Sequence, residues 1–366
     1  MATTSPKPRI EIRQATPDDL EVVVALLSER DGCALSAEAV ASELQGLDPD
    51  RYVAWIATVD GVPAAMNSFF LRTLTSDGPE PRELRTGYWA NLYVGEPYRK
   101  LMIYPQLVFA MIKGMRALKL DLLLGGIRQP DVAEGHLKLG YRQFGEIPVL
   151  MKPMRPFRLV ARQKRLGRFL EALAPAPDAL WGGWLAARRS GSRDGITIEE
   201  VSLDDPRIER LVELLQARTR GRVAMRWDAD SFRRRFRMAI DGERYVLHLA
   251  TRGDEVLGGV IHRLAWRGNG VRTGVVLDLV LAPDRDSAGA SLLARAEERM
   301  RHDGADITLL LDGIDPVTSD IARRGGYRAS GEVYYMMANP GTVWPPDSWE
   351  DDISNWLFTF SDHDAF

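Results

Sequence analysis

The sequence is poor in the residue types that cross-link chains or bind metals. Its 366 residues include a single cysteine, Cys33, which excludes an internal disulfide framework and a thiolate metal cluster. The five histidines are scattered, so we expect no metal site. No apolar run approaches the roughly 18 residues that a membrane-spanning helix needs. The opening stretch, MATTSPKPRIEIRQ, resembles neither a secretory signal nor a transit peptide. We therefore expect a cytoplasmic protein without a membrane or DNA partner.

Charge is distributed unevenly along the chain. The formal net charge is −3, yet residues 151–240 contain 20 basic and 11 acidic side chains. The last 26 residues contain six acidic side chains and no basic one. A basic middle segment suits an anionic partner such as RNA, but arginines in this pattern are more often solvated helix faces paired with nearby acids. Both interpretations stay open at this point.

An internal repeat organises the sequence. IEIRQATPDDLEVVVALL, from Ile10, is similar to ITIEEVSLDDPRIERLVELL, from Ile196. Further matches follow in the same order in both halves, and they comprise Tyr52 with Tyr245, Gly126-Ile127 with Gly313-Ile314, and Gly140-Tyr141 with Gly326-Tyr327. Four ordered matches indicate a tandem duplication.

Each half predicts the element order β-α-ββ-β-α-β-α-β, which is an α/β fold with a mixed sheet. The fold class is therefore two tandem mixed-sheet domains joined by a helical linker. The expected boundaries are 1–154 for the first domain, 155–195 for a basic helical linker, 196–340 for the second domain, and 341–366 for an acidic, aromatic tail packed on the second domain.

This order of elements, with the turn and loop residues between them, resembles the GNAT acyltransferase superfamily, once in each half. In that family the fourth strand leads into an R-x-x-G-x-G/A loop that opens a helix, whose backbone N–H groups and dipole hold the pyrophosphate of an acyl-CoA. A later N-x-x-A-x-x-x-Y-x-K-x-G-F/Y stretch supplies a tyrosine that protonates the leaving thiolate. The tail NWLFTFSDHDAF and the stretch GRVAMRWDADSFRRRFR resemble two-domain GNAT proteins of polysaccharide and natural-product loci.

In the first half, LYVGEPYRKLMIYPQL is similar to the donor-binding loop. The resemblance assigns donor binding to Tyr93, Val94, Arg99, Lys100, Leu101, Met102, Ile103, Tyr104 and Gln129. Met102 and Tyr104 replace the two small residues of the family pattern, which narrows the phosphate cradle. His136 stands at the tyrosine position, where an imidazole with a pKa nearer neutral could donate the proton; a surface histidine is the alternative.

In the second half, Arg285, Ala288 and Ala290 fit the donor-binding loop, with Ala288 in place of the first glycine. Asp278 lies where many family members have a carboxylate that deprotonates an amine. Asn91 is its counterpart in the first half and orients a group without accepting a proton. Ala322 stands at the second half's tyrosine position, so neither half is complete.

The resemblance implies an N-acyltransferase that moves an acyl group, such as acetyl, from an acyl-CoA co-substrate to a primary amine of a small molecule, without a metal. A biosynthetic role would follow. One alternative is an aminoacyl-tRNA donor, as in the Fem-type transferases, with tRNA bound to the basic 155–240 region. Its expected footprint is Arg158, Arg162, Lys164, Arg165 and Arg168. A second alternative is a non-catalytic binding protein.

Overall fold

The computed structural model describes residues 7–163, 174–187, 195–237, 239–240, 243–266, 270–312, 315–339 and 344–362. The strands of the first half are β1 (Ile10–Gln14), β2 (Tyr52–Val59), β3 (Val62–Ser76), β4 (Arg82–Val94), β5 (Leu122–Ile127) and β6 (Arg142–Pro153). Those of the second half are β7 (Thr197–Val201), β8 (Val223–Met225), β9 (Ala239–Ile240), β10 (Glu243–Arg244), β11 (Val246–Arg252), β12 (Glu255–Trp266), β13 (Arg272–Leu281), β14 (Ile307–Leu311) and β15 (Arg328–Asn339), and the tail adds β16 (Trp356–Leu357).

The α-helices follow the repeat. They are α1 (Leu20–Asp31), α2 (Ala37–Glu43), α3 (Ile103–Ala117), α4 (Pro130–Lys138), α5 (Pro156–Gln163), α7 (Pro175–Ala187), α8 (Arg207–Arg218), α9 (Ala229–Arg237), α10 (Asp286–His302) and α11 (Pro316–Arg324). Short 3-10 helices complete the elements at η1 (Pro17–Asp19), η2 (Gln45–Leu47), η3 (Glu96–Leu101), η4 (Trp349–Asp351) and η5 (Ile353–Asn355). The mixed α/β fold predicted for each half is confirmed. The repeat match at Gly313-Ile314 lies outside the described residues.

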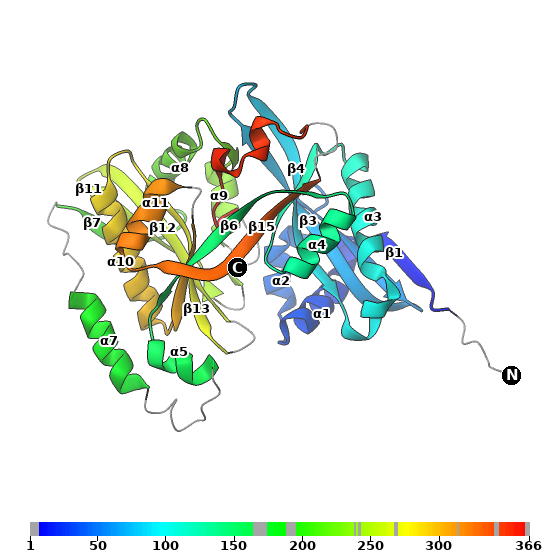
Figure 1. The fold of residues 1–366 in the computed structure, drawn as a ribbon, viewed down its shortest axis with the longest axis horizontal. Coiled ribbons are helices and arrows are strands. Elements are labelled where there is room, and N and C mark those ends of the chain that lie inside the picture. Colours follow the sequence, from blue (N-terminus) through cyan, green and yellow to red (C-terminus); the bar gives the residue numbers. More distant parts are fainter. Residues whose placement is uncertain are drawn as a thin grey trace.

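The two halves share one sheet because their last strands change places. The order through the described strands of this sheet is β1-β2-β3-β4-β5-β15-β6-β14-β13-β12-β11-β7; β8 also pairs with β3, and β16 pairs with β8. β15, from the second half, pairs with β5 of the first, and β6, from the first half, pairs with β14 of the second. β6 and β15 also pair with each other and cross the middle of the molecule side by side (Figure 1). These hydrogen bonds join the predicted units into one sheet; the domain boundaries themselves stay predictions.

A buried ion pair fixes this exchange. Lys152, near the end of β6, donates from Nζ to Oε2 of Glu297 on α10 at 2.7 Å, and the two side chains are 9% and 4% exposed. The Lys152 ammonium also lies 5.7 Å from the ring centroid of Tyr327, which precedes β15. Each of these buried charges destabilises the fold unless the other is present, because removing one leaves the other without a counter-charge in the core.

The sheet buries three apolar clusters. One face carries a cluster that runs through both halves and includes residues of α1, α2, α8 and α9. The opposite face carries two separate clusters, one under α3 and α4 and one under α10 and α11. Figure 1 shows α3, α4, α10 and α11 on the near side, with α1 and α2 behind the sheet. Neighbouring residues of β4 illustrate the alternation, since Tyr88 joins the shared cluster and Trp89 the one under α3.

The tail contacts both halves. Trp344 and Trp356 are buried against Phe144 of β6, with ring centroids 5.1 and 4.7 Å from it. Glu350 accepts hydrogen bonds from Ser76 of β3 and Arg82 of β4. In the second half, β16 pairs with β8, and the Trp227 indole donates to Asp362 at 3.0 Å. The tail therefore packs on the first half as well as on the second.

The described part of the linker is helical, as expected. Asp178 of α7 accepts hydrogen bonds from the first backbone N–H groups of α5, at Phe157 and Arg158. The Trp181 indole donates to the carbonyl of Pro153 at 3.2 Å, which ties α7 to the end of β6. These contacts anchor both helices at the end of the exchanged strand.

Glu297→Gln tests the ion pair. The change leaves the Lys152 ammonium buried without a counter-charge, and we expect the free energy of unfolding to fall by about 3–5 kcal/mol. Urea denaturation measures it. The double variant Lys152→Met, Glu297→Leu removes both charges and is expected to recover most of the loss. A double variant no more stable than the single one would contradict this account.

A second buried pair consists of two histidines. His248 of β11 and His262 of β12 stack with ring centroids 5.3 Å apart and planes 11° from parallel. Both side chains are buried, and none of their four ring nitrogens has a hydrogen-bond partner among the described residues. Burial lowers the pKa of His248 to about 4 and that of His262 to about 3, and the charge of Arg299 acts in the same direction. Both imidazoles are therefore neutral in the folded protein at pH 7.

Acid sensitivity follows from these lowered pKa values. An unfolded histidine, with a pKa of about 6.5, binds a proton that the folded one does not. The stability contributed by the neutral pair is therefore complete above pH 6.5 and is lost as the pH falls toward 4, by about 1.4 kcal/mol per pH unit for each group. Urea denaturation between pH 7.5 and 4.5 should show a shallower decline for the His248→Leu, His262→Leu variant than for the wild type. His302→Gln, at an exposed histidine, should leave the decline of the free energy of unfolding with pH unchanged. The same decline in all three proteins would contradict this account.

Candidate functional site

Each half contains a place where two parallel strands separate. β4 pairs with β5 only over Thr86–Tyr88, and β13 pairs with β14 only over Thr273–Val275. Beyond these residues the two strands of each pair no longer form backbone hydrogen bonds with each other, although the strands themselves continue. Each fourth strand also shifts register at this point, between Ala90 and Tyr93 in β4 and between Val276 and Asp278 in β13. A bulge of this kind exposes backbone groups and redirects side chains, so each separation forms a candidate cleft.

In the first half, Asn91 occupies the bulge. Its φ of +53° lies in the left-handed region, which asparagine tolerates better than most residues. Its side-chain oxygen accepts a hydrogen bond from Arg30 of α1 at 2.6 Å, and its amide nitrogen donates to the hydroxyl of Tyr52 at 3.2 Å. Burial raises the pKa of Tyr52, so its hydroxyl stays protonated. The predicted orienting role of Asn91 fits this network and stays a prediction.

The loop after β4 leads into α3. Arg99 is exposed and its Nε donates to the carbonyl of Val94 at 3.4 Å. Met102 has a φ of +56° and is 67% exposed immediately before α3. Pro105, in the first turn, has no N–H group to offer a phosphate. The helix start is therefore open to solvent with a reduced set of donors.

The remaining predicted donor residues differ in their exposure. Tyr93 and Val94 are half-buried, as is Leu101, while Lys100 and Gln129 are exposed, and Ile103 is buried in the core beneath. Burial and the neighbouring Glu29 raise the pKa of Tyr93.

His136 lies behind the cleft in an aromatic cluster. It is fully buried, with its ring centroid 4.0 Å from that of Trp89. Its Nδ1 is 2.6 Å from the hydroxyl of Tyr104 and 2.9 Å from the carbonyl of Val132, and its Nε2 has no partner among the described residues. Burial lowers the pKa of His136 to about 4, in contrast to the near-neutral pKa expected from the sequence. The imidazole is therefore neutral at pH 7. The half-buried Tyr104 hydroxyl is the polar group beside it.

The second cleft is filled. Both carboxylate oxygens of Asp278 accept hydrogen bonds from Arg218 of α8, at 2.8 and 2.9 Å, and the carboxylate is 3% exposed. From the tail, Thr359 contacts Asp278 and the backbone N–H of Ser361 donates to the carbonyl of Leu277 at the bulge. The space left among these residues measures about 20 Å³. An acceptor amine therefore has no route to Asp278 in this arrangement.

The other second-half candidates lie apart from Asp278. Arg285 precedes α10 and pairs with Glu255 at 3.3 Å. Ala288 is buried in the helix and Ala290 is exposed. Their proposed contact with a donor stays a prediction.

Sequence reasoning missed the two arginines that hold the bulges. Arg30 ends α1 and contacts Asn91, and Arg218 ends α8 and contacts Asp278. They are 188 residues apart, whereas the repeat is offset by 186 at Asp18-Asp19 and Asp204-Asp205. An alignment that allowed a two-residue insertion in the helix region would have paired them.

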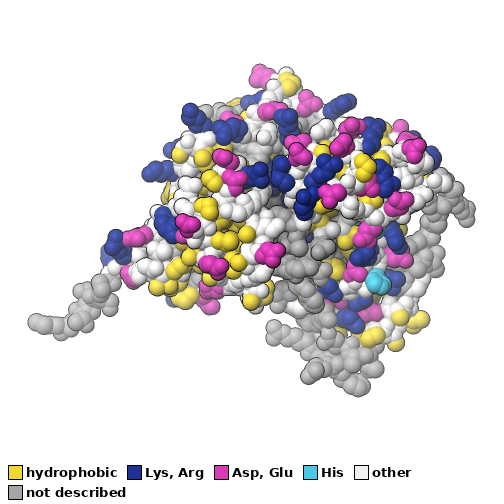
Figure 2. Space-filling view, turned by 180° about the vertical axis from the view of Figure 1, so that it is seen from behind, with side chains coloured by type: hydrophobic (Ala, Val, Ile, Leu, Met, Phe, Trp, Pro, Cys, Tyr) yellow, Lys and Arg dark blue, Asp and Glu magenta, His cyan; other side chains and the backbone are white. Residues whose placement is uncertain are grey.

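Six described arginines of the basic middle segment form ion pairs with acidic side chains. Arg207 pairs with Glu199 and Asp205, and Arg237 pairs with Asp204. Figure 2 likewise shows basic and acidic side chains interspersed over one face of the molecule. Of the predicted tRNA footprint, Arg158 is half-buried; Lys164, Arg165 and Arg168 and the Arg162 side chain lie outside the described residues.

Among the described residues, no group of three or more histidine, cysteine, aspartate or glutamate side chains is arranged to hold a metal ion. No described helix is long and apolar enough to cross a membrane.

Comparisons with known proteins identify the fold. Neither a protein-family model nor a curated sequence matches the chain. The structure is similar to *Saccharomyces cerevisiae* N-myristoyltransferase with bound myristoyl-CoA, with a TM-score of 0.66 and 12% identity, over 97% of this chain and 87% of that one. It is also similar to a GCN5-related N-acetyltransferase from *Anabaena variabilis*, with a TM-score of 0.56 and 12% identity, over 90% and 72% of the two chains. A probable N-acyltransferase from *Enterococcus faecalis* gives a TM-score of 0.58 at 11% identity, over 91% and 72%. The chain therefore has the GNAT fold that the sequence predicted.

Asp278→Asn tests whether this carboxylate is structural. The change removes one negative charge from the buried Arg218 guanidinium, and we expect the free energy of unfolding to fall by about 3 kcal/mol. Asp320→Asn, at an exposed carboxylate of α11, should change it by less than about 1 kcal/mol. Chemical denaturation measures both. Unchanged stability in Asp278→Asn would show that the carboxylate does not stabilise the fold by pairing with Arg218.

Proposed function

We propose that the protein is an N-acyltransferase that binds an acyl-CoA in its first half and transfers the acyl group to a primary amine. The observation that carries the proposal is the contrast between the two strand separations. In the first half the start of α3 after β4 is exposed, whereas in the second half Arg218 and the tail fill the space at Asp278. The similarity to N-acyltransferases, one of them with a bound acyl-CoA, supports the same reaction class.

The residues of the first half suit such a donor in part. Arg99 and the adjacent Lys100 offer positive charge beside the start of α3, where the helix dipole also favours phosphate. Met102 is at the edge of this position and its long, exposed side chain can move aside. Pro105 removes one backbone donor, so side-chain charge carries more of the phosphate binding than in a glycine-rich loop.

Catalysis would rest on positioning and on backbone polarity. A backbone N–H group at the β4 bulge would polarise the thioester carbonyl, and Arg30 contacts this bulge through Asn91. The neutral amine attacks the carbonyl carbon, the carbon–sulfur bond breaks, and the proton that the amine nitrogen loses is balanced by the one that the thiolate gains. Tyr104, whose hydroxyl lies 2.6 Å from Nδ1 of His136, is a hydroxyl donor in the first turn of α3. Juxtaposition of donor and acceptor would supply much of the acceleration.

An aminoacyl-tRNA donor is the second candidate. Met102 and Pro105 both weaken a compact pyrophosphate site, which is the observation that favours it. A tRNA must be bound through many backbone phosphates, so its affinity falls steeply with salt, whereas that of CoA falls modestly. The acid partners of the described arginines favour CoA.

The repeat supplies a matched pair of variants to test the donor site. We expect Arg99→Ala to weaken CoA binding roughly fivefold, by about 1 kcal/mol, because it removes one exposed charge from the phosphates. Arg285→Ala, the corresponding change in the second half, should leave the affinity unchanged. Isothermal titration calorimetry with CoA measures both, and the Michaelis constant for acetyl-CoA should follow the same order.

The opposite order of the two variants would move the donor to the second half. Absence of CoA binding, together with tight and salt-sensitive binding of a mixed tRNA pool, would replace CoA by the tRNA donor. Binding of neither would favour the non-catalytic alternative.

A further inference from the structure

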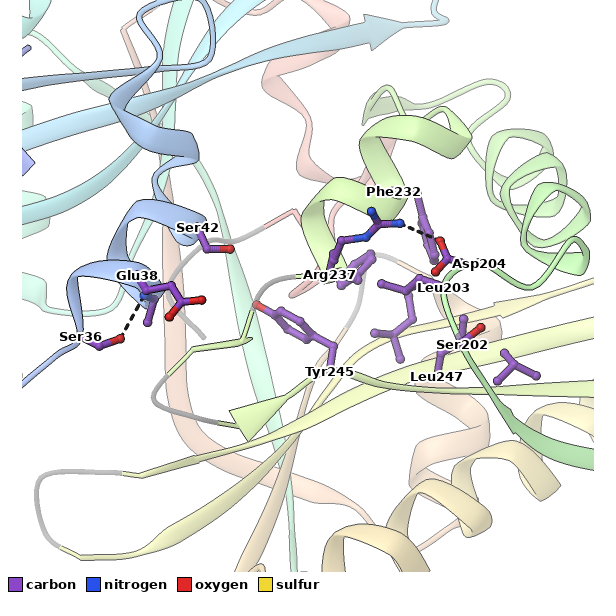
Figure 3. Close-up of a pocket in the computed structure, with 14 residues that line it drawn as sticks. Ser36, Glu38, Ser42, Ser202, Leu203, Asp204, Phe232, Arg237, Tyr245 and Leu247 are labelled. Atoms are coloured by element: carbon purple, nitrogen blue, oxygen red, sulfur yellow. Dashed lines mark hydrogen bonds and ion pairs between the residues drawn. The ribbon is translucent and has the colours of Figure 1, made fainter. Parts of the chain in front are cut away.

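A large cavity lies between the two halves, away from the donor site. It encloses about 670 Å³, within the roughly 300–1,000 Å³ typical of small-molecule sites. One wall is α2 of the first half, and the other consists of the loop before α8, the helix α9 and strand β11 of the second half (Figure 3).

The floor of the cavity is apolar. Val201, Leu247 and Ile261 are register neighbours on β7, β11 and β12, so their side chains form one row on the same face of the sheet. Phe232 and Phe236 of α9 stand beside this row, with ring centroids 4.8 Å apart. Such a floor stabilises a hydrocarbon chain or ring by removing it from water.

The α2 wall is polar and negative. The Glu38 side chain is exposed and points into the cavity, near Ser42 (Figure 3). Across the cavity, Asp204 is already paired with Arg237 at 2.7 Å. Two carboxylates line the cavity, Glu38 and Asp204. Of these, Glu38 forms no ion pair with the described part of the chain.

Two buried arginines lie beside Tyr245, a lining residue. The guanidinium groups of Arg235 and Arg263 are 5.2 and 5.6 Å from its ring centroid. Arg235 also donates to the Tyr245 hydroxyl at 2.5 Å. Neither arginine lines the cavity, so Glu38 is the charged lining group that is left to meet a ligand.

We propose that this cavity binds an amphipathic organic amine, with its ammonium group at Glu38 and its hydrocarbon part on the floor formed by Phe232, Phe236, Leu247 and Ile261. This site goes beyond the proposed acyl transfer, because it shares no residue with the candidate donor site. An anionic amphipath attracted by the buried arginines is the competing occupant.

Three probes of equal chain length separate the charge contribution from the apolar one. Binding of octylamine, octanol and octanoate to the full chain, without CoA, is measured by isothermal titration calorimetry at pH 7. We expect octylamine to bind most tightly and octanoate most weakly. Glu38→Gln should weaken octylamine binding about fivefold and leave octanol unchanged, since only the ammonium group uses the carboxylate.

Two further variants serve as controls. Ser42→Trp places an indole in the cavity from an exposed position on α2 and should abolish binding of all three probes. Glu21→Gln, at an exposed carboxylate of α1 outside the cavity, should change nothing. Stronger binding of octanoate, binding that Ser42→Trp does not affect, or no saturable binding of octylamine would each overturn the proposal. Since no CoA is present, these outcomes are independent of whether the donor site binds it.

Discussion

The exchange of the two final strands is the constraint on which the rest of the structure depends. Without β15, the edge of β5 would be unpaired, and without β6 the same would hold for β14. Each half therefore completes its sheet with a strand of the other, and an unpaired edge in the centre of the molecule is avoided. Lys152 and Glu297 fix the register at one end of the crossing, while Phe144 of β6 anchors the tail tryptophans at the other. The clefts, the tail and the cavity between the halves all have positions set by this crossing.

The two halves share an arginine contact at the fourth-strand bulge but differ in its burial. Both halves place an arginine from the end of their first helix against the residue at the bulge of the fourth strand. In the first half the partner is the neutral Asn91, and the network stays near the surface beside an open helix start. In the second the partner is Asp278, whose charge permits a buried, bidentate ion pair, and Thr359 and Ser361 then cover it. A single difference between an amide and a carboxylate is thus accompanied by an exposed helix start in the first half and a filled space in the second.

The sequence predicted the elements well because their signals are local. Ordered matches such as Tyr52 with Tyr245 identified the duplication, and the strand and helix order followed from hydrophobic periodicity. The strand exchange was not predictable in this way, because β6 and β15 have the same pattern whichever half they complete. The burial of His136 was missed for a related reason: its motif gives its position on α4, but its exposure depends on Trp89 and Tyr104 from other elements. Long-range packing of this kind leaves no signature at the residue itself.

Helix α2 lies between the cavity and the Asn91 network of the first half. Ser42 faces the cavity between the halves, while the next residue, Glu43, lies close enough to Tyr52 to influence its pKa, and Tyr52 in turn holds Asn91 at the β4 bulge. Successive residues on a helix point about 100° apart, so one short helix presents one face to the cavity and another to the bulge. A ligand that presses on the Glu38 and Ser42 face therefore acts on an element whose other side borders the Asn91 network. Helix α2 has only seven residues, and the buried side chains of Val40 and Leu44 hold it against the shared core. The cavity and the Asn91 network therefore border different faces of one short helix whose position the core fixes.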